Sequence, residues 1–137
     1  MKRILAVDYG DVRIGLALSD PFKIISKPFK VIKNVDFSLI LEEFSQIVAE
    51  KNIGLIVFGM PYYADGKISP KGQEVKKFAD KISNSLGIKI EYYDERHSSQ
   101  NANKYLINKG YSIKESKKII DKFAAAVILE NYLKTIQ

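Results

Sequence analysis

The sequence predicts an α/β protein whose mixed five-stranded sheet is flanked by helices. Three of the strands are expected to form an antiparallel meander, and two further strands to run parallel. Uncharged apolar runs at 4–7 and 53–58 are typical of strands buried on both faces. After three strand-like segments, strand and helix patterns alternate, which favours parallel pairing. The 137 residues are expected to form a single domain, 1–137.

The first half of the chain begins with a predicted hairpin. Segments 3–8 and 13–19 are its two strands, with a tight glycine-containing turn between them. Segment 28–33 is a weaker third strand, which we expect at a sheet edge. Asp36 is a favoured N-cap residue, and apolar residues at helical spacing predict a helix over 37–51.

The second half begins with the fourth predicted strand, 53–58. Segment 62–72 is expected to be a mobile surface loop. The next helix starts at Pro70 and ends at Gly87, the usual places for these residues. Segment 88–93 alternates apolar and charged residues and is the fifth strand. Two more helices are expected, one from about 99 to 109 and one from the capping box Ser112–Glu115 to about 133.

The composition restricts the class of protein. The formal net charge is +6, which favours a polyanionic partner such as nucleic acid, although lysines scattered for solubility would give the same value. No apolar run approaches the roughly 20 residues of a membrane helix, and 4–7 is too short for a signal peptide. The absence of cysteine excludes disulfides and thiolate metal sites. We expect a cytoplasmic protein.

Carboxylates follow two of the predicted parallel strands. Asp8 ends the first strand, and Asp94 and Glu95 follow the fifth. Because the carboxyl ends of parallel strands share one edge of a sheet, these acids are expected to meet there. Asp121 lies on the apolar side of the last helix and could reach the same edge. Three such acids would form an all-oxygen site suited to Mg²⁺ or Mn²⁺, the ions that assist phosphodiester hydrolysis.

Basic residues are placed to hold a phosphate backbone beside these acids. The lysines of the last helix would equally serve as a solvated helix face. The candidates are Arg13, Lys71, Arg96, Lys117, Lys118 and Lys122.

Four blocks of this chain, taken in order, resemble the YqgF/RuvX family, described as pre-16S rRNA nucleases and Holliday-junction-resolvase-like proteins. The resemblance covers nearly the whole chain. Each block alone is weakly specific, but the four at these spacings are strongly so. They are Asp8-x-Gly10-x-x-Arg13-x-Gly15-x-Ala17, then Gly59-Met60-Pro61 with Asp65-Gly66, then Asp94-Glu95-Arg96-x-Ser98-Ser99, and finally Asp121-x-x-Ala124-Ala125-x-x-Ile128-Leu129-x-x-Tyr132-Leu133.

The resemblance implies an RNase H-like fold and a divalent-metal-dependent nuclease. Its motifs assign Asp8, Glu95 and Asp121 as metal-binding catalytic residues. The implied task is processing of the 5′ end of pre-16S rRNA in precursor particles, or cleavage of branched DNA. His97 departs from the apolar residue usual in the family. Residues at the substrate edge would be Arg13, Arg96, Ser98 and Ser99, beside Lys71 and Lys118 from the charge pattern.

Other interpretations stay open at this point. Asp8 would also suit a simple turn, Asp94 is an alternative ligand to Glu95, and Asp121 would also suit an exposed helix start. The first hairpin also resembles that of actin-like ATPases, but the chain is too short for their two lobes. A non-catalytic RNA-binding maturation factor is a further alternative. Dinucleotide and Walker-type phosphate motifs are absent from the sequence.

Overall fold

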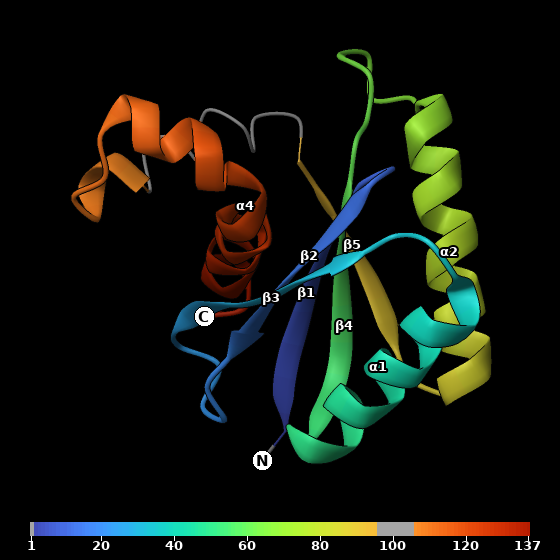
Figure 1. Cartoon of the computed structure of the whole chain (residues 1–137). Coiled ribbons are helices and arrows are strands. Elements are labelled where there is room, and N and C mark those ends of the chain that lie inside the picture. The colour runs from blue at the N-terminus through green and yellow to red at the C-terminus, as the bar shows by residue number, and fades with distance from the viewer. Residues whose placement is uncertain (1, 96–105) are drawn as a thin grey trace.

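The computed structural model describes residues 2–95 and 106–137, and for 113–122 it describes the backbone only. The order of elements is the predicted one, with strands first and helices alternating afterwards (Figure 1). The strands are β1 (Arg3–Tyr9), β2 (Arg13–Ser19), β3 (Ser26–Lys33), β4 (Ile53–Met60) and β5 (Ile90–Asp94), and the helices are α1 (Phe37–Glu50), α2 (Pro70–Leu86) and α4 (Ile113–Thr135).

The five strands form one mixed sheet in the order β3-β2-β1-β4-β5. Strands β1, β2 and β3 pair in antiparallel fashion, as the predicted meander requires. Strand β4 lies parallel to β1 and β5 lies parallel to β4. The carboxyl ends of β1, β4 and β5 therefore lie at one end of the sheet, the upper end in Figure 1. The predicted fold class is confirmed.

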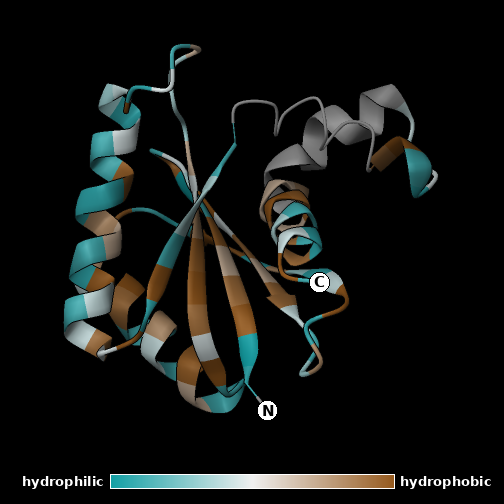
Figure 2. Cartoon of the chain, turned by 180° about the vertical axis from the view of Figure 1, so that it is seen from behind, coloured by the Kyte–Doolittle hydropathy of each residue, from teal (hydrophilic) through white to brown (hydrophobic). Residues whose placement is uncertain are grey.

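Helices cover the two faces of the sheet unequally. Leu5 and Val7 of β1 pack in the same core cluster as Phe44 of α1 and Phe78 of α2. The alternate residues of β1 face α4 instead, because successive strand side chains point to opposite faces. This second cluster contains Ile4, Ala6, Ala125, Ala126, Ile128 and Leu129. The central strands are apolar along most of their length (Figure 2).

Local sequence signals set most of the element ends. The Asp36 side chain accepts a hydrogen bond from the Ser38 N–H at the start of α1, and Gly87 ends α2 with φ at 62°. Five strand ends differ from prediction by one or two residues, and β1 and β5 each continue one residue further, to Tyr9 and Asp94. Strand β3 starts earlier, at Ser26, and β4 extends to Met60, where it pairs with Asp94 of β5. Ile88 is buried ahead of β5 but pairs with no strand there.

The segment 62–72 lies at the surface as expected, and it contains local order. Tyr62 pairs with Ile68 in an isolated antiparallel bridge. The Tyr63 N–H donates to the Lys67 carbonyl at 2.8 Å. Most of the predicted helix at 99–109 lies outside the described residues. Within the described part of the chain, no helix is long and apolar enough to cross a bilayer.

Candidate active site

Asp8 lies near the carboxyl end of the central strand β1. Its register partner is Gly15 of β2, and it follows Ile4 and Ala6 on the face that α4 covers. The residue is half-buried. The buried run before it fixes the strand, so Asp8 is held at the edge of the core rather than in a loose turn.

Glu95 reaches the same face from the end of β5. Its backbone N–H donates to the Met60 carbonyl at 3.2 Å, which extends the parallel pairing by one residue. Its side chain crosses Gly59 of β4. A methyl group at Gly59 would lie 3.0 Å from the Glu95 carboxyl carbon and 2.6 Å from Ile128 Cδ1 of α4. Glycine at 59 therefore leaves the space that the Glu95 side chain occupies under α4.

The acids at this end of the sheet strongly affect each other's charge. Burial, together with the negative charges of Asp8 and Asp94, raises the pKa of Glu95 from 4.5 to about 8. The positive charge of Lys71 partly opposes this rise. Without a bound cation, Glu95 therefore keeps its proton at neutral pH.

Lys71, at the start of α2, is a predicted phosphate-binding residue whose contacts the structure describes. Its ammonium forms an ion pair with Asp11 in the β1–β2 turn and lies 3.5 Å from Glu74. It also lies 5.2 Å from the centroid of the Tyr9 ring. Although burial lowers the pKa of Lys71, its hydrogen bond and ion pair with Asp11 give a net rise. Lys71 thus links the start of α2 to the β1–β2 turn beside the carboxyl end of the sheet.

The structure brings together some of the predicted site residues and leaves others undescribed. Asp94 is exposed at the end of β5, and Arg13 is the exposed first residue of β2. Asp121 belongs to α4, four residues before the buried Ala125, but its side chain lies outside the described part. The same holds for the Lys117, Lys118 and Lys122 side chains. Arg96, His97, Ser98 and Ser99 lie wholly outside the described residues.

The carboxylates fit a hard divalent cation, although the described part does not contain a complete ligand set. Among the described residues, no group of three or more Asp, Glu or His side chains is close enough to hold a metal ion. Asp8 and Glu95 supply the carboxylate oxygens that Mg²⁺ prefers. Burial, and then the charges of Asp8 and Asp94, raise the pKa of Glu95, and a bound cation would favour its ionised form.

Gly59 belongs to one of the four sequence blocks, but the sequence did not reveal what the glycine is for. The glycine of its Gly-Met-Pro block stands at the predicted end of a strand, where a turn is the simpler explanation. A glycine inside a strand often marks a close approach by another group, and this was the available signal. The group that approaches, the Glu95 side chain, comes from a distant part of the chain.

Solved structures with the same arrangement define the class of fold. The structure of Thermus thermophilus RuvC in complex with Holliday junction substrate matches with a TM-score of 0.60 at 12% identity, covering 99% of this chain and 96% of that one. The Fowlpox virus resolvase with Holliday junction DNA matches with a TM-score of 0.56 at 13% identity, covering 98% of each chain. At these identities the likeness concerns the fold, which is the RNase H-like fold of resolvases.

The chain belongs to the RuvX family, whose model carries the description Holliday junction resolvase and matches residues 2–135. A Clostridioides difficile protein named "Putative pre-16S rRNA nuclease" is 37% identical over 131 residues, covering 96% of this chain and 93% of the relative. A Mesomycoplasma hyopneumoniae protein of the same name is 37% identical over 136 residues, covering 98% and 95%. The family resemblance of the four sequence blocks is thereby confirmed.

Proposed function

We propose that the protein is a divalent-metal-dependent nuclease that hydrolyses phosphodiester bonds in structured RNA, with the 5′ end of pre-16S rRNA as its substrate. The observation that carries this proposal is that the carboxyl groups of Asp8 and Glu95 lie near each other at the carboxyl end of the sheet. The charge of Asp8 helps to keep Glu95 protonated in the cation-free protein. A cation bound between the two carboxyl groups would stabilise their ionised forms.

The residues of the site have distinct roles in this proposal. Asp8 and Glu95 hold the cation from β1 and β5, and Asp121 of α4 is the proposed third ligand. When bound, Mg²⁺ or Mn²⁺ activates water and stabilises developing negative charge on phosphate oxygens. Gly59 keeps the space through which Glu95 reaches the site. A cation held there would favour the ionised form of Glu95.

Positive residues around the carboxylates are proposed to position the nucleic acid backbone. Lys71 is held by Asp11 and Glu74, and these contacts keep its ammonium beside the site. The positive charge of Lys71 lowers the pKa of Glu95, so the ammonium acts on the site directly. Arg13, Arg96, Ser98, Ser99 and Lys118 complete the proposed substrate edge. Contacts of this kind set affinity and register rather than base sequence.

The choice of RNA rests on the names of the relatives, which point to pre-16S rRNA. The description of the family model, Holliday junction resolvase, favours a four-way DNA junction as the alternative substrate. Both reactions break a phosphodiester bond and need the same carboxylates. The two alternatives therefore differ in the nucleic acid that is bound and not in the bond that is cleaved.

A cleavage assay tests the proposal. The purified protein is incubated with Mg²⁺ or Mn²⁺ and one of three substrates: an RNA carrying a 16S precursor 5′ end, an unstructured RNA, or a four-way DNA junction. We expect metal-dependent cleavage of the precursor RNA, abolished by chelation and reduced at least 100-fold by Asp8→Asn. Asp80→Asn, which neutralises an exposed acid of α2, is the matched control and should cleave normally.

Three results would change the proposal. Preferential cleavage of the junction would keep the nuclease and replace the substrate. Equal cleavage by wild type and Asp8→Asn would refute the role of the carboxylates. Salt-sensitive RNA binding without cleavage, unaffected by Asp8→Asn, would instead support a non-catalytic maturation factor.

A further inference from the structure

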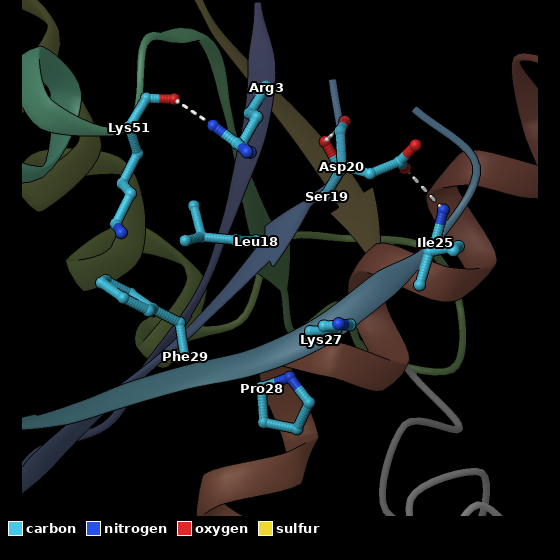
Figure 3. A pocket seen from close by; sticks show the side chains of 9 residues that line it. All are labelled: Arg3, Leu18, Ser19, Asp20, Ile25, Lys27, Pro28, Phe29 and Lys51. Atoms are coloured by element: carbon cyan, nitrogen blue, oxygen red, sulfur yellow. Dashed lines mark hydrogen bonds between the residues drawn. The ribbon is translucent and has the colours of Figure 1, made fainter. Parts of the chain in front are cut away.

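A cavity of about 310 Å³ lies at the end of the sheet opposite the carboxylates. It is formed where the start of β1, the end of β2 and the start of β3 meet the carboxyl end of α1 (Figure 3). Arg3 and Asp8 are five residues apart on one strand, which separates them by about 17 Å. They also point to opposite faces of the sheet. Asp8 lies on the same face as Ile4 and Ala6, whereas Arg3 lies on the face of Leu5 and Val7. The cavity is therefore separate from the proposed active site.

The lining of this cavity carries three cations, Arg3, Lys27 and Lys51. Within the described part of the chain, none of them is paired with a carboxylate. The Arg3 guanidinium donates one hydrogen bond to the Lys51 carbonyl at 3.3 Å, which fixes its position and uses one of five N–H donors. A phosphate group is the ligand for which such a set of donors is suited.

Asp20, the acid among the described lining residues, forms no ion pair with these cations. Both carboxylate oxygens of Asp20 accept backbone N–H groups of its own loop, from Phe22 at 3.2 Å, Ile24 at 2.7 Å and Ile25 at 2.8 Å. The carboxylate is thus used to shape the β2–β3 loop. The Ser19 hydroxyl is likewise engaged, because it accepts the Ile4 N–H at 2.8 Å and donates to the Asp20 carbonyl.

The remaining walls of the cavity are apolar and partly aromatic. Leu18, Pro28 and Phe29 line it, and the Lys51 ammonium lies 5.7 Å from the centroid of the Phe29 ring. The adjoining loop, tied by Asp20, leaves the Phe22 side chain 68% exposed. A flat apolar group could therefore stack beside the bound phosphate. The volume is at the lower end of the range for small-molecule sites.

We propose that this cavity binds a nucleoside phosphate, with the phosphate on Arg3, Lys27 and Lys51 and the base against the apolar wall near Phe29. The ligand is either a free mononucleotide or a nucleotide unit of a bound RNA chain, because both present the same chemistry. This site goes beyond the proposed nuclease and does not depend on its cleavage chemistry. Failure of one proposal leaves the other intact.

Amide NMR spectra of the ¹⁵N-labelled protein test the proposal. AMP, inorganic phosphate and a short single-stranded RNA are titrated separately into the intact chain without metal. AMP is expected to shift the amides of 18–27 and Lys51 in a saturable way, and to bind at least five times more tightly than phosphate. If the RNA shifts the same amides, the ligand is a nucleotide of the chain; if only AMP does, it is a free nucleotide.

A pair of double variants provides the control for general charge. Lys27→Gln with Lys51→Gln should weaken AMP binding about tenfold, since two charge-assisted contacts are lost while the Lys51 carbonyl stays in place. Lys76→Gln with Lys89→Gln removes the same charge from exposed positions elsewhere and should change the affinity less than twofold. The proposal is overturned if AMP and RNA leave the cavity amides unshifted, if phosphate binds as tightly as AMP, or if both double variants lose affinity equally.

Discussion

Replacing Glu95 with glutamine is expected to stabilise the cation-free protein at alkaline pH, although it removes a proposed ligand. In the unfolded chain this carboxyl loses its proton near pH 4.5, whereas the folded protein retains it up to about pH 8. The unfolded state therefore binds fewer protons throughout this interval. Wild-type stability falls as the pH rises from 4.5 to 8 and then stays at the lower value.

The size of the effect follows from the same interval. At about 1.4 kcal/mol for each pH unit, the full penalty on the folded state would approach about 5 kcal/mol above pH 8. Glu95 is half-buried, and solvent screening reduces the interaction with Asp8 and Asp94. We therefore expect Glu95→Gln to be about 2–3 kcal/mol more stable than wild type at pH 8.5, and less than about 1 kcal/mol more stable at pH 5.

Urea unfolding in the presence of a chelator measures this difference. Wild type, Glu95→Gln and the control Glu42→Gln, which changes an exposed acid of α1, are compared at pH 5 and pH 8.5. The control should show the same difference from wild type at both pH values. A stability difference for Glu95→Gln that does not grow with pH would refute the electrostatic account of the site.

Three further predictions concern the same end of the sheet. Gly59→Ala should cost about 1–3 kcal/mol and weaken Mn²⁺ binding in calorimetry, because its methyl group would lie 2.6 Å from Ile128 Cδ1 and 3.0 Å from the Glu95 carboxyl carbon. An unchanged Mn²⁺ affinity would contradict the role of Gly59. The apparent Mn²⁺ affinity of wild type should rise between pH 6 and pH 8 as Glu95 gives up its proton, and a flat profile would oppose this. Lys71→Gln should weaken RNA binding about three- to tenfold and lower the salt slope by about one in fluorescence anisotropy; an unchanged slope would remove Lys71 from the interface.

Much of the fold could be predicted because its signals are local. The uncharged run of β1, the Asp36 cap and the αL glycine at 87 each determine structure through their own neighbours. The parallel arrangement of β1, β4 and β5 followed from the alternation of strands and helices. That arrangement was enough to place Asp8 and Glu95 at one end of the sheet. The single-domain and cytoplasmic assignments stay predictions.

The features that sequence did not reveal depend on contacts between distant segments. Strand β4 continues past Phe58 because Met60 pairs with Asp94, which a local reading of Gly59 as a strand end misses. Strand β3 begins earlier than predicted, and the Ser26 hydroxyl there donates to the Ala126 carbonyl of α4 at 2.7 Å. The raised pKa of Glu95 likewise depends on burial and on charges from two other positions.

The central claim is that Asp8 and Glu95 act together as one divalent-cation site. Calorimetric titration with Mn²⁺ at pH 7.5 tests it directly in wild type, Asp8→Asn, Glu95→Gln and the double variant. We expect each single variant to lose at least tenfold in affinity and the double variant to lose far less than the product of the two losses, because the residues share one ion. Binding that is unchanged in all three variants would contradict the account.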